Sequence, residues 1–177
     1  MSKEIIQLGD KHLRVVCEPN PEPHITDIKT QELLQDLDKA LASQADGVAI
    51  SAPQIAITQR VFVVGGMVFD KDFQNKTTDH VDPTIPNRYY INPTITKTSR
   101  KTCEMEEGCL SIRGVYGNVI RPEKITIEYY NENGEKKREG ASGFLARVLQ
   151  HEYDHLNGIL FIDKAVDTWQ DEKYKGN

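Results

Sequence analysis

The sequence predicts an α+β fold in which mostly antiparallel sheets pack around a central helix, with a second helix near the N-terminus. Two observations support this class: strand-like segments gather in the middle of the 177-residue chain, and helical periodicity occurs towards both ends. The length fits one catalytic domain over residues 1–177. A hydrophobic fraction of 38% supplies enough apolar side chains for one core.

The first helix is expected at residues 30–45, with Thr30 as its cap and Gly47 beyond its end. Four leucines recur there at helical spacing and define a buried face: Leu33, Leu34, Leu37 and Leu41. An apolar segment follows at residues 48–55, broken by a proline.

Short strands are expected on either side of a long loop. Residues 60–64 and 89–95 are rich in β-branched and aromatic residues, which is typical of strands. Residues 70–88 between them are polar and contain two prolines, which predicts a surface loop.

The second half of the chain begins with strands and ends with a helix. Strands are expected at residues 119–120, 124–130 and 135–140, the last two joined by an Asn133-Gly134 hairpin turn. Residues 142–155 then show helical periodicity, with Ser142 as a cap and a stop at Asn157-Gly158.

Charge and composition restrict the partners. A net charge of -5 argues against nucleic acid, which requires clustered positive charge. No segment approaches the roughly 18 apolar residues of a membrane helix, and the first residues lack the pattern of a signal peptide. We therefore expect a cytoplasmic protein without membrane association. The odd number of cysteines (Cys17, Cys103 and Cys109) argues against a disulfide framework and favours a metal or catalytic role for one of them.

The strongest chemical signal is an H-E-x-x-H motif, residues 151–155, on the predicted C-terminal helix. A spacing of four residues places His151 and His155 one turn apart, where a single ion can bind both. A catalytic site of this kind needs a third protein ligand and one open position. The cysteines are better candidates for that ligand than the remaining histidines, and their spacing favours Cys109 over Cys103 only weakly.

Three segments together resemble the peptide deformylase family. Residues 47–54 are similar to its G-x-G-x-A-A-x-Q motif, residues 107–111 to its Glu-Gly-Cys-Leu-Ser motif, and residues 150–158 contain its H-E-x-x-H helix. The resemblance implies one divalent metal per chain, with Fe²⁺ as the expected native ion and Zn²⁺, Ni²⁺ or Co²⁺ able to take its place. The ligands it implies are Cys109, His151 and His155.

The resemblance also implies the reaction, which is removal of the formyl group from the N-terminal formylmethionine of new proteins, with release of formate. Glu152 is expected to accept a proton from water and pass it to the leaving nitrogen. The Gln54 side chain and the Leu110 backbone N–H are expected to donate to the developing oxyanion, as similar positions do in the family. Expected substrate contacts are Gly47, Val48, Ala49, Ile50, Tyr116 and Val148. Asp154 or Glu107 is expected to orient a ligand histidine.

Two residues of the first motif depart from the family pattern: Ala49 stands where glycine is usual and Ser51 where alanine is usual. An alanine at position 49 either crowds the substrate backbone or requires a negative φ. Both changes leave the metal donors untouched but leave substrate preference and rate open.

Two alternatives therefore stay open. One is a non-catalytic or substrate-altered deformylase-like metal protein. The other is a metallopeptidase with a third ligand downstream of His155, where Asp163 is the candidate. The short tail of mixed charge does not favour ribosome docking, for which family members use a longer basic helix, and the oligomeric state is open.

Overall fold

The computed structural model describes residues 3–70, 73, 82 and 84–172. The longer helices are α1 (Ile28–Ala42) and α3 (Gly143–His155). The strands are β1 (Ala49–Ser51), β2 (Val61–Val64), β3 (Arg88–Thr98), β4 (Thr102–Cys109), β5 (Ile112–Pro122), β6 (Lys124–Tyr130), β7 (Lys136–Ser142) and β8 (Ala165–Gln170). These elements confirm the α+β class.

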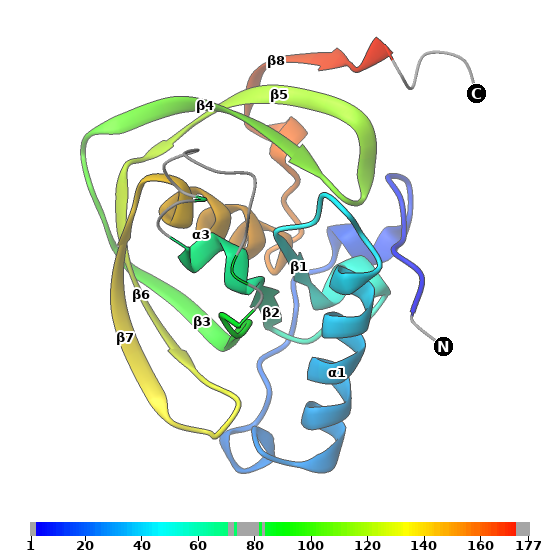
Figure 1. The fold of residues 1–177 in the computed structure, drawn as a ribbon, viewed down its shortest axis with the longest axis vertical. Coiled ribbons are helices and arrows are strands. Elements are labelled where there is room, and N and C mark those ends of the chain that lie inside the picture. The colour runs from blue at the N-terminus through cyan, green and yellow to red at the C-terminus, as the bar shows by residue number, and fades with distance from the viewer. Residues whose placement is uncertain (1–2, 71–72, 74–81, 83, 173–177) are drawn as a thin grey trace.

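The strands form two sheets, one with five strands in the order β1-β2-β3-β6-β7 and one with three in the order β4-β5-β8. The recorded strand pairings are antiparallel, as predicted. In Figure 1, strands β4 to β7 curve around α3, whereas α1 lies beside β1 and β2. The site described below lies where α3 meets β1 and β4.

The five-stranded sheet has a helix packed on each face. Phe62 of β2 belongs to the core cluster that contains Val148 and Leu149 of α3. The alternate residue, Val63, belongs to a second cluster with the leucines of α1. Because successive side chains of a strand point to opposite faces, a strand buried on both faces is apolar throughout, as β2 is.

The two predicted helices are present, with one correction. The four leucines predicted for the first helix are buried, but α1 begins two residues earlier than expected and its N-cap is Asp27. The prediction that Thr30 caps this helix was wrong, because Thr30 lies inside it and its hydroxyl donates to the His24 carbonyl at 2.7 Å. Ser142 does occupy the N-cap position of α3.

Gly158 lies just beyond the end of α3, where a helix stop was predicted. Its φ of +70° lies in the left-handed region, and a Cβ there would approach the Arg14 carbonyl oxygen to 2.6 Å. A glycine is therefore needed for the chain to turn away directly after the histidines of α3.

Strands β1, β4 and β8 were not predicted as strands, and only residues 119–120 of β5 were. Most of the loop expected at residues 70–88 lies outside the described residues. Within the described part of the chain, no helix is both long and apolar enough to cross a membrane.

Candidate active site

Helix α3 presents two histidines from one face. The His151 and His155 rings lie one turn apart with centroids separated by 5.0 Å. His155 Nε2 lies 3.3 Å from the sulfur of Cys109, and His151 Nδ1 lies 2.9 Å from a carboxylate oxygen of Glu107. One donor atom each from Cys109, His151 and His155 lies within 4.8 Å of the other two.

Cys109 reaches this position because β4 ends in an irregularity. The register between β4 and β5 shifts between Gly108 and Cys109, and such bulges redirect the following side chain. The Tyr116 ring packs directly on Gly108, because a Cβ at this position would come within 2.9 Å of the ring. The sequence Gly108-Cys109 thus places both an aromatic ring and a thiol beside α3.

A buried network of charges lies behind the histidines. Arg121 binds Glu107 through Nε at 2.6 Å and Asp154 through Nη1 at 2.6 Å. Arg147 adds a contact of 2.9 Å to Glu107. Burial alone would raise the pKa of Glu107, but hydrogen bonds from Arg121 and His151 outweigh it and hold that pKa well below its ordinary value. The Glu107 carboxylate is therefore ionised where it contacts His151.

The three donors suit a divalent cation. Burial lowers the pKa of His151, but hydrogen bonds with Cys109 and Glu107 outweigh it and raise that pKa to about 10. The His151 ring is therefore protonated without a metal and would have to lose that proton to become a ligand. Burial holds the pKa of His155 well below its ordinary value, which keeps that imidazole neutral, as a metal ligand must be. One thiol and two imidazoles match the donors of a catalytic site with an open position.

Glu152 lies next to the first histidine and is 4% exposed. Burial raises the pKa of Glu152 to about 7, whereas His151 and a hydrogen bond with Ser51 lower it. Its Oε2 has no hydrogen-bond partner among the described residues. A carboxyl group with a pKa near neutrality can both accept and return a proton.

Gln54 lies beside the donors, on the short 3-10 helix Ala52–Ile55 that follows β1. Its Nε2 lies 3.6 Å from the sulfur of Cys109 and 3.3 Å from the hydroxyl of Ser111. The neighbouring Leu110 lies between β4 and β5 and lines the same pocket. Gln54 and Leu110 therefore both line the pocket that contains Cys109.

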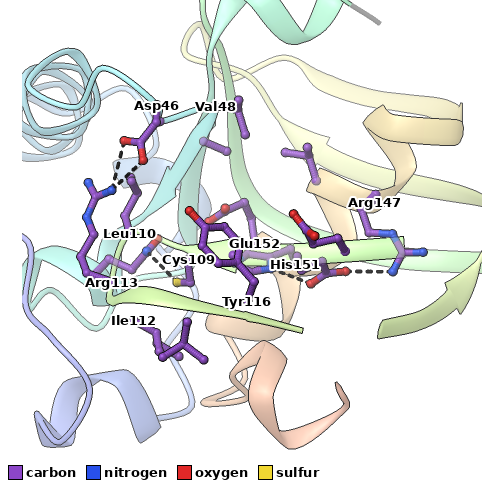
Figure 2. A pocket seen from close by; sticks show the side chains of 18 of the residues that line it. Asp46, Val48, Cys109, Leu110, Ile112, Arg113, Tyr116, Arg147, His151 and Glu152 are labelled. Carbon is purple, nitrogen blue, oxygen red and sulfur yellow. Dashed lines mark hydrogen bonds and ion pairs between the residues drawn. The ribbon is translucent and has the colours of Figure 1, made fainter. Parts of the chain in front are cut away.

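A cavity of about 320 Å³ opens beside these groups. Figure 2 shows Cys109, Tyr116, His151 and Glu152 together in it, with Arg147 to one side. Five of the six predicted substrate-contact residues line it: Gly47, Val48, Ala49, Tyr116 and Val148. Ala49 lies in extended β1 and does not have a positive φ, so its methyl group causes no backbone strain.

Some expectations about neighbouring residues need correction. Ile50 is not part of the cavity wall, because its side chain is fully buried in the core cluster around α1. Of the two carboxylates considered for orienting a histidine, Glu107 contacts His151, whereas Asp154 binds Arg121 and Lys164.

Several residues that line or support the cavity were not predicted from the sequence, and one alternative metal ligand, Asp163, had been left open. The missed residues are Arg147 and Phe144, which line the cavity, and Ser111 and Arg121, which bind Gln54 and Glu107. Asp163, the candidate third ligand of a metallopeptidase, binds Arg14 and the Leu160 N–H and is not in the group of donors found among the described residues.

The chain is an α+β protein in which two histidines of an H-E-x-x-H helix and a cysteine at the end of a strand form a group of donors that can hold a metal ion, with a buried carboxyl group beside it. A family model described as polypeptide deformylase matches residues 2–171.

Individual relatives agree. A peptide deformylase of Treponema pallidum is 38% identical over 169 residues, which cover 96% of this chain and 91% of that protein. One of Prochlorococcus marinus is 38% identical and covers 93% of this chain and 73% of that protein.

Solved structures show the same likeness. A Synechococcus elongatus peptide deformylase in complex with actinonin superposes with a TM-score of 0.76 at 35% identity, covering 93% of this chain and 79% of that one. An Acinetobacter baumannii class I type b peptide deformylase bound to Met-Ala-Ser gives a TM-score of 0.78 at 29% identity, covering 93% and 98%. The chain belongs to the peptide deformylase family and is an enzyme of that family.

Proposed function

We propose that this chain removes the N-formyl group from N-terminal formylmethionine of newly made proteins in the cytoplasm and releases formate. The observation that carries the proposal is the group of Cys109, His151 and His155 donors beside a cavity, with Glu152 buried at its edge. The Met-Ala-Ser peptide bound by the Acinetobacter baumannii relative supports a site for a methionine-first chain.

Cys109, His151 and His155 would hold one divalent cation, for which Fe²⁺ is our proposed native ion and Zn²⁺, Ni²⁺ or Co²⁺ substitutes. The chemistry that such a cation supplies is a lowered pKa of water, from 15.7 towards ~7, and polarisation of a carbonyl group. Glu107 supports this arrangement, because its carboxylate fixes the orientation of the His151 ring.

The chain's own residues supply the remaining steps. Glu152 accepts the proton from the attacking water and delivers it to the nitrogen of methionine as the C–N bond breaks, so that formate and a free amine leave. Burial, which disfavours the charged carboxylate and raises the pKa of Glu152, helps this group to hold the proton between the two transfers. The Gln54 amide and the Leu110 N–H donate to the carbonyl oxygen as it gains negative charge.

The substrate lies in the cavity beside these groups. Gly47, Val48 and Ala49 lie along one edge, where we propose that the peptide backbone passes. Val148 and Tyr116 supply apolar surface for the methionine side chain.

The test is formate release from formyl-Met-Ala by anaerobically purified protein, with the metal content measured. We expect turnover by the wild type and its loss in Glu152→Ala that still holds one metal per chain. Acetyl-Met-Ala and unformylated Met-Ala-Ser serve as control substrates, since a peptidase would cleave the latter. A metal-loaded wild type that releases no formate would exclude the proposed reaction.

A further inference from the structure

Ser51, one of the two departures within the first motif, lies against Gln54, the proposed oxyanion donor. It is the last residue of β1, and its exposed fraction is 0%. Its backbone N–H donates to Gln54 Oε1 at 2.8 Å, and its hydroxyl lies 2.9 Å from the same oxygen. The spacing is that of a capping box, in which the third residue of a helix reaches back to the cap.

These two bonds decide which way the Gln54 amide faces. A glutamine side chain has one acceptor oxygen and one NH₂ donor group, which differ little in shape. With the oxygen towards Ser51, Nε2 faces the sulfur of Cys109 and the hydroxyl of Ser111. The flipped amide would set its NH₂ group against the backbone N–H of Ser51 in a buried space, which leaves donors unsatisfied.

The hydroxyl is the part of this arrangement that an alanine would lack. With alanine at position 51, the backbone N–H alone would hold the amide oxygen. The hydroxyl provides a second donor at that oxygen, and its single hydrogen is used in this bond. Ser51 therefore acts on the Gln54 amide through two donors, of which alanine would keep only the backbone N–H.

We propose that Ser51 is a positioning residue, whose hydroxyl locks the Gln54 amide with Nε2 towards the reacting carbonyl group. The inference rests on the proposed function. Stabilisation that is present only in the transition state changes kcat and leaves KM unchanged. Loss of one buried hydrogen bond is worth roughly a 5- to 30-fold change. We expect Ser51→Ala to reduce kcat by about that factor, with KM and metal content unchanged.

The matched control is Thr30→Val, which removes another buried hydroxyl, on α1 and away from the cavity. It should leave kcat unchanged even if it lowers the melting temperature. A Ser51→Ala protein with wild-type kcat, or with a raised KM as its only defect, would overturn the inference.

A double-mutant cycle separates positioning from general structural support. Since the hydroxyl acts through Gln54, Ser51→Ala should cause less than about a twofold further loss of kcat when Gln54 is already alanine. An equal loss in both backgrounds would overturn the inference, because the effect would then not pass through Gln54.

A measurement without substrate tests the same point independently of turnover. In ¹⁵N-labelled wild type, the Gln54 side-chain amide should be as ordered as a rigid backbone, with an order parameter of about 0.85, and Ser51→Ala should lower it below about 0.6. If the wild type releases no formate, the proposed function fails while this test still decides the locking. If the amide stays ordered in Ser51→Ala, the inference fails whatever the turnover.

Discussion

The two sides of the cavity are held in place by different interactions. On the α3 and β4 side, Arg121 and Arg147 form buried ion pairs with Glu107, which contacts His151. On the β1 side, Gln54 is held by neutral hydrogen bonds from the backbone and hydroxyl of Ser51. Removing one partner of a buried ion pair leaves an uncompensated charge, whereas a neutral hydrogen bond contributes much less to stability.

Substitutions on the two sides of the cavity should therefore have different effects. Changes on the charged side should alter stability and metal affinity. Changes on the neutral side should alter turnover and leave stability and metal content nearly intact.

Arg121→Met should have the largest effect on stability. It leaves the Asp154 and Glu107 carboxylates without their shared guanidinium in a site where Arg121 is 3% exposed. We expect the free energy of unfolding to fall by about 3–5 kcal/mol. Denaturant unfolding of the metal-free protein measures it.

The control for that variant is Arg138→Met, which removes an arginine paired with Glu128 on the surface. Its loss should stay below about 1 kcal/mol. Equal losses from the two variants would show that burial of the charged network does not set its contribution.

Gln54→Ala tests the neutral side. We expect kcat to fall by roughly 10²–10³-fold, because one oxyanion donor is removed. Metal content and the free energy of unfolding should stay close to those of the wild type. Gln35→Ala, an exposed glutamine on α1, is the control and should turn over normally. Lost metal in Gln54→Ala would contradict the division, since the amide would then support the donors as well.

Glu107→Gln tests the link between the charged network and the donors. The neutral amide cannot supply the carboxylate that now contacts His151 at 2.9 Å. We expect metal affinity to weaken by about 10–100-fold. Competition of Zn²⁺ or Co²⁺ with a chromophoric chelator measures it. Glu104→Gln, on the exposed part of the same strand, is the matched control and should bind metal normally. Unchanged affinity in Glu107→Gln would limit this carboxylate to a structural role.

Most of the fold could be predicted where a buried face leaves a pattern in the sequence. Helices α1 and α3 and strands β2, β3 and β6 each have apolar residues at the matching spacing. Strand β8 has no such pattern, because almost all of its residues are exposed. In β4, alternate residues are exposed, and among them are the charged residues Glu104 and Glu106. Both are fixed by backbone pairing with β5, such as Val115 with Gln170, which no local pattern encodes.

Site residues that lie close together in the sequence could be predicted, whereas those brought together by the fold could not. His151, Glu152 and His155 follow from spacing on one helix. Cys109 is distant in the sequence, and the family resemblance was needed to select it. The choice between Glu107 and Asp154 depends on how β4 approaches α3, and buried Arg121 and Arg147 resemble surface charges when only the sequence is known.

An ion pair at the surface should contribute less to the free energy of unfolding than the buried ion pairs around Glu107. Asp163 pairs with Arg14, and the two side chains are 38% and 45% exposed. The hydrogen bond from Arg14 outweighs a small contribution of burial and lowers the pKa of Asp163 from its ordinary 3.8. Because the folded pKa lies below the unfolded one, the stabilisation is present above the unfolded pKa and is lost as the pH falls through the folded pKa.

Asp163→Asn should therefore lower the free energy of unfolding by less than about 1 kcal/mol at pH 7, since solvent screens an exposed pair. The difference from the wild type should shrink as the pH falls below about 4. Urea unfolding of both proteins from pH 7 to pH 3 measures this trend. A loss of several kcal/mol at pH 7 would instead group Asp163 with the buried network, and would mean that the charge stabilisation of this enzyme extends beyond the α3–β4 side of the cavity.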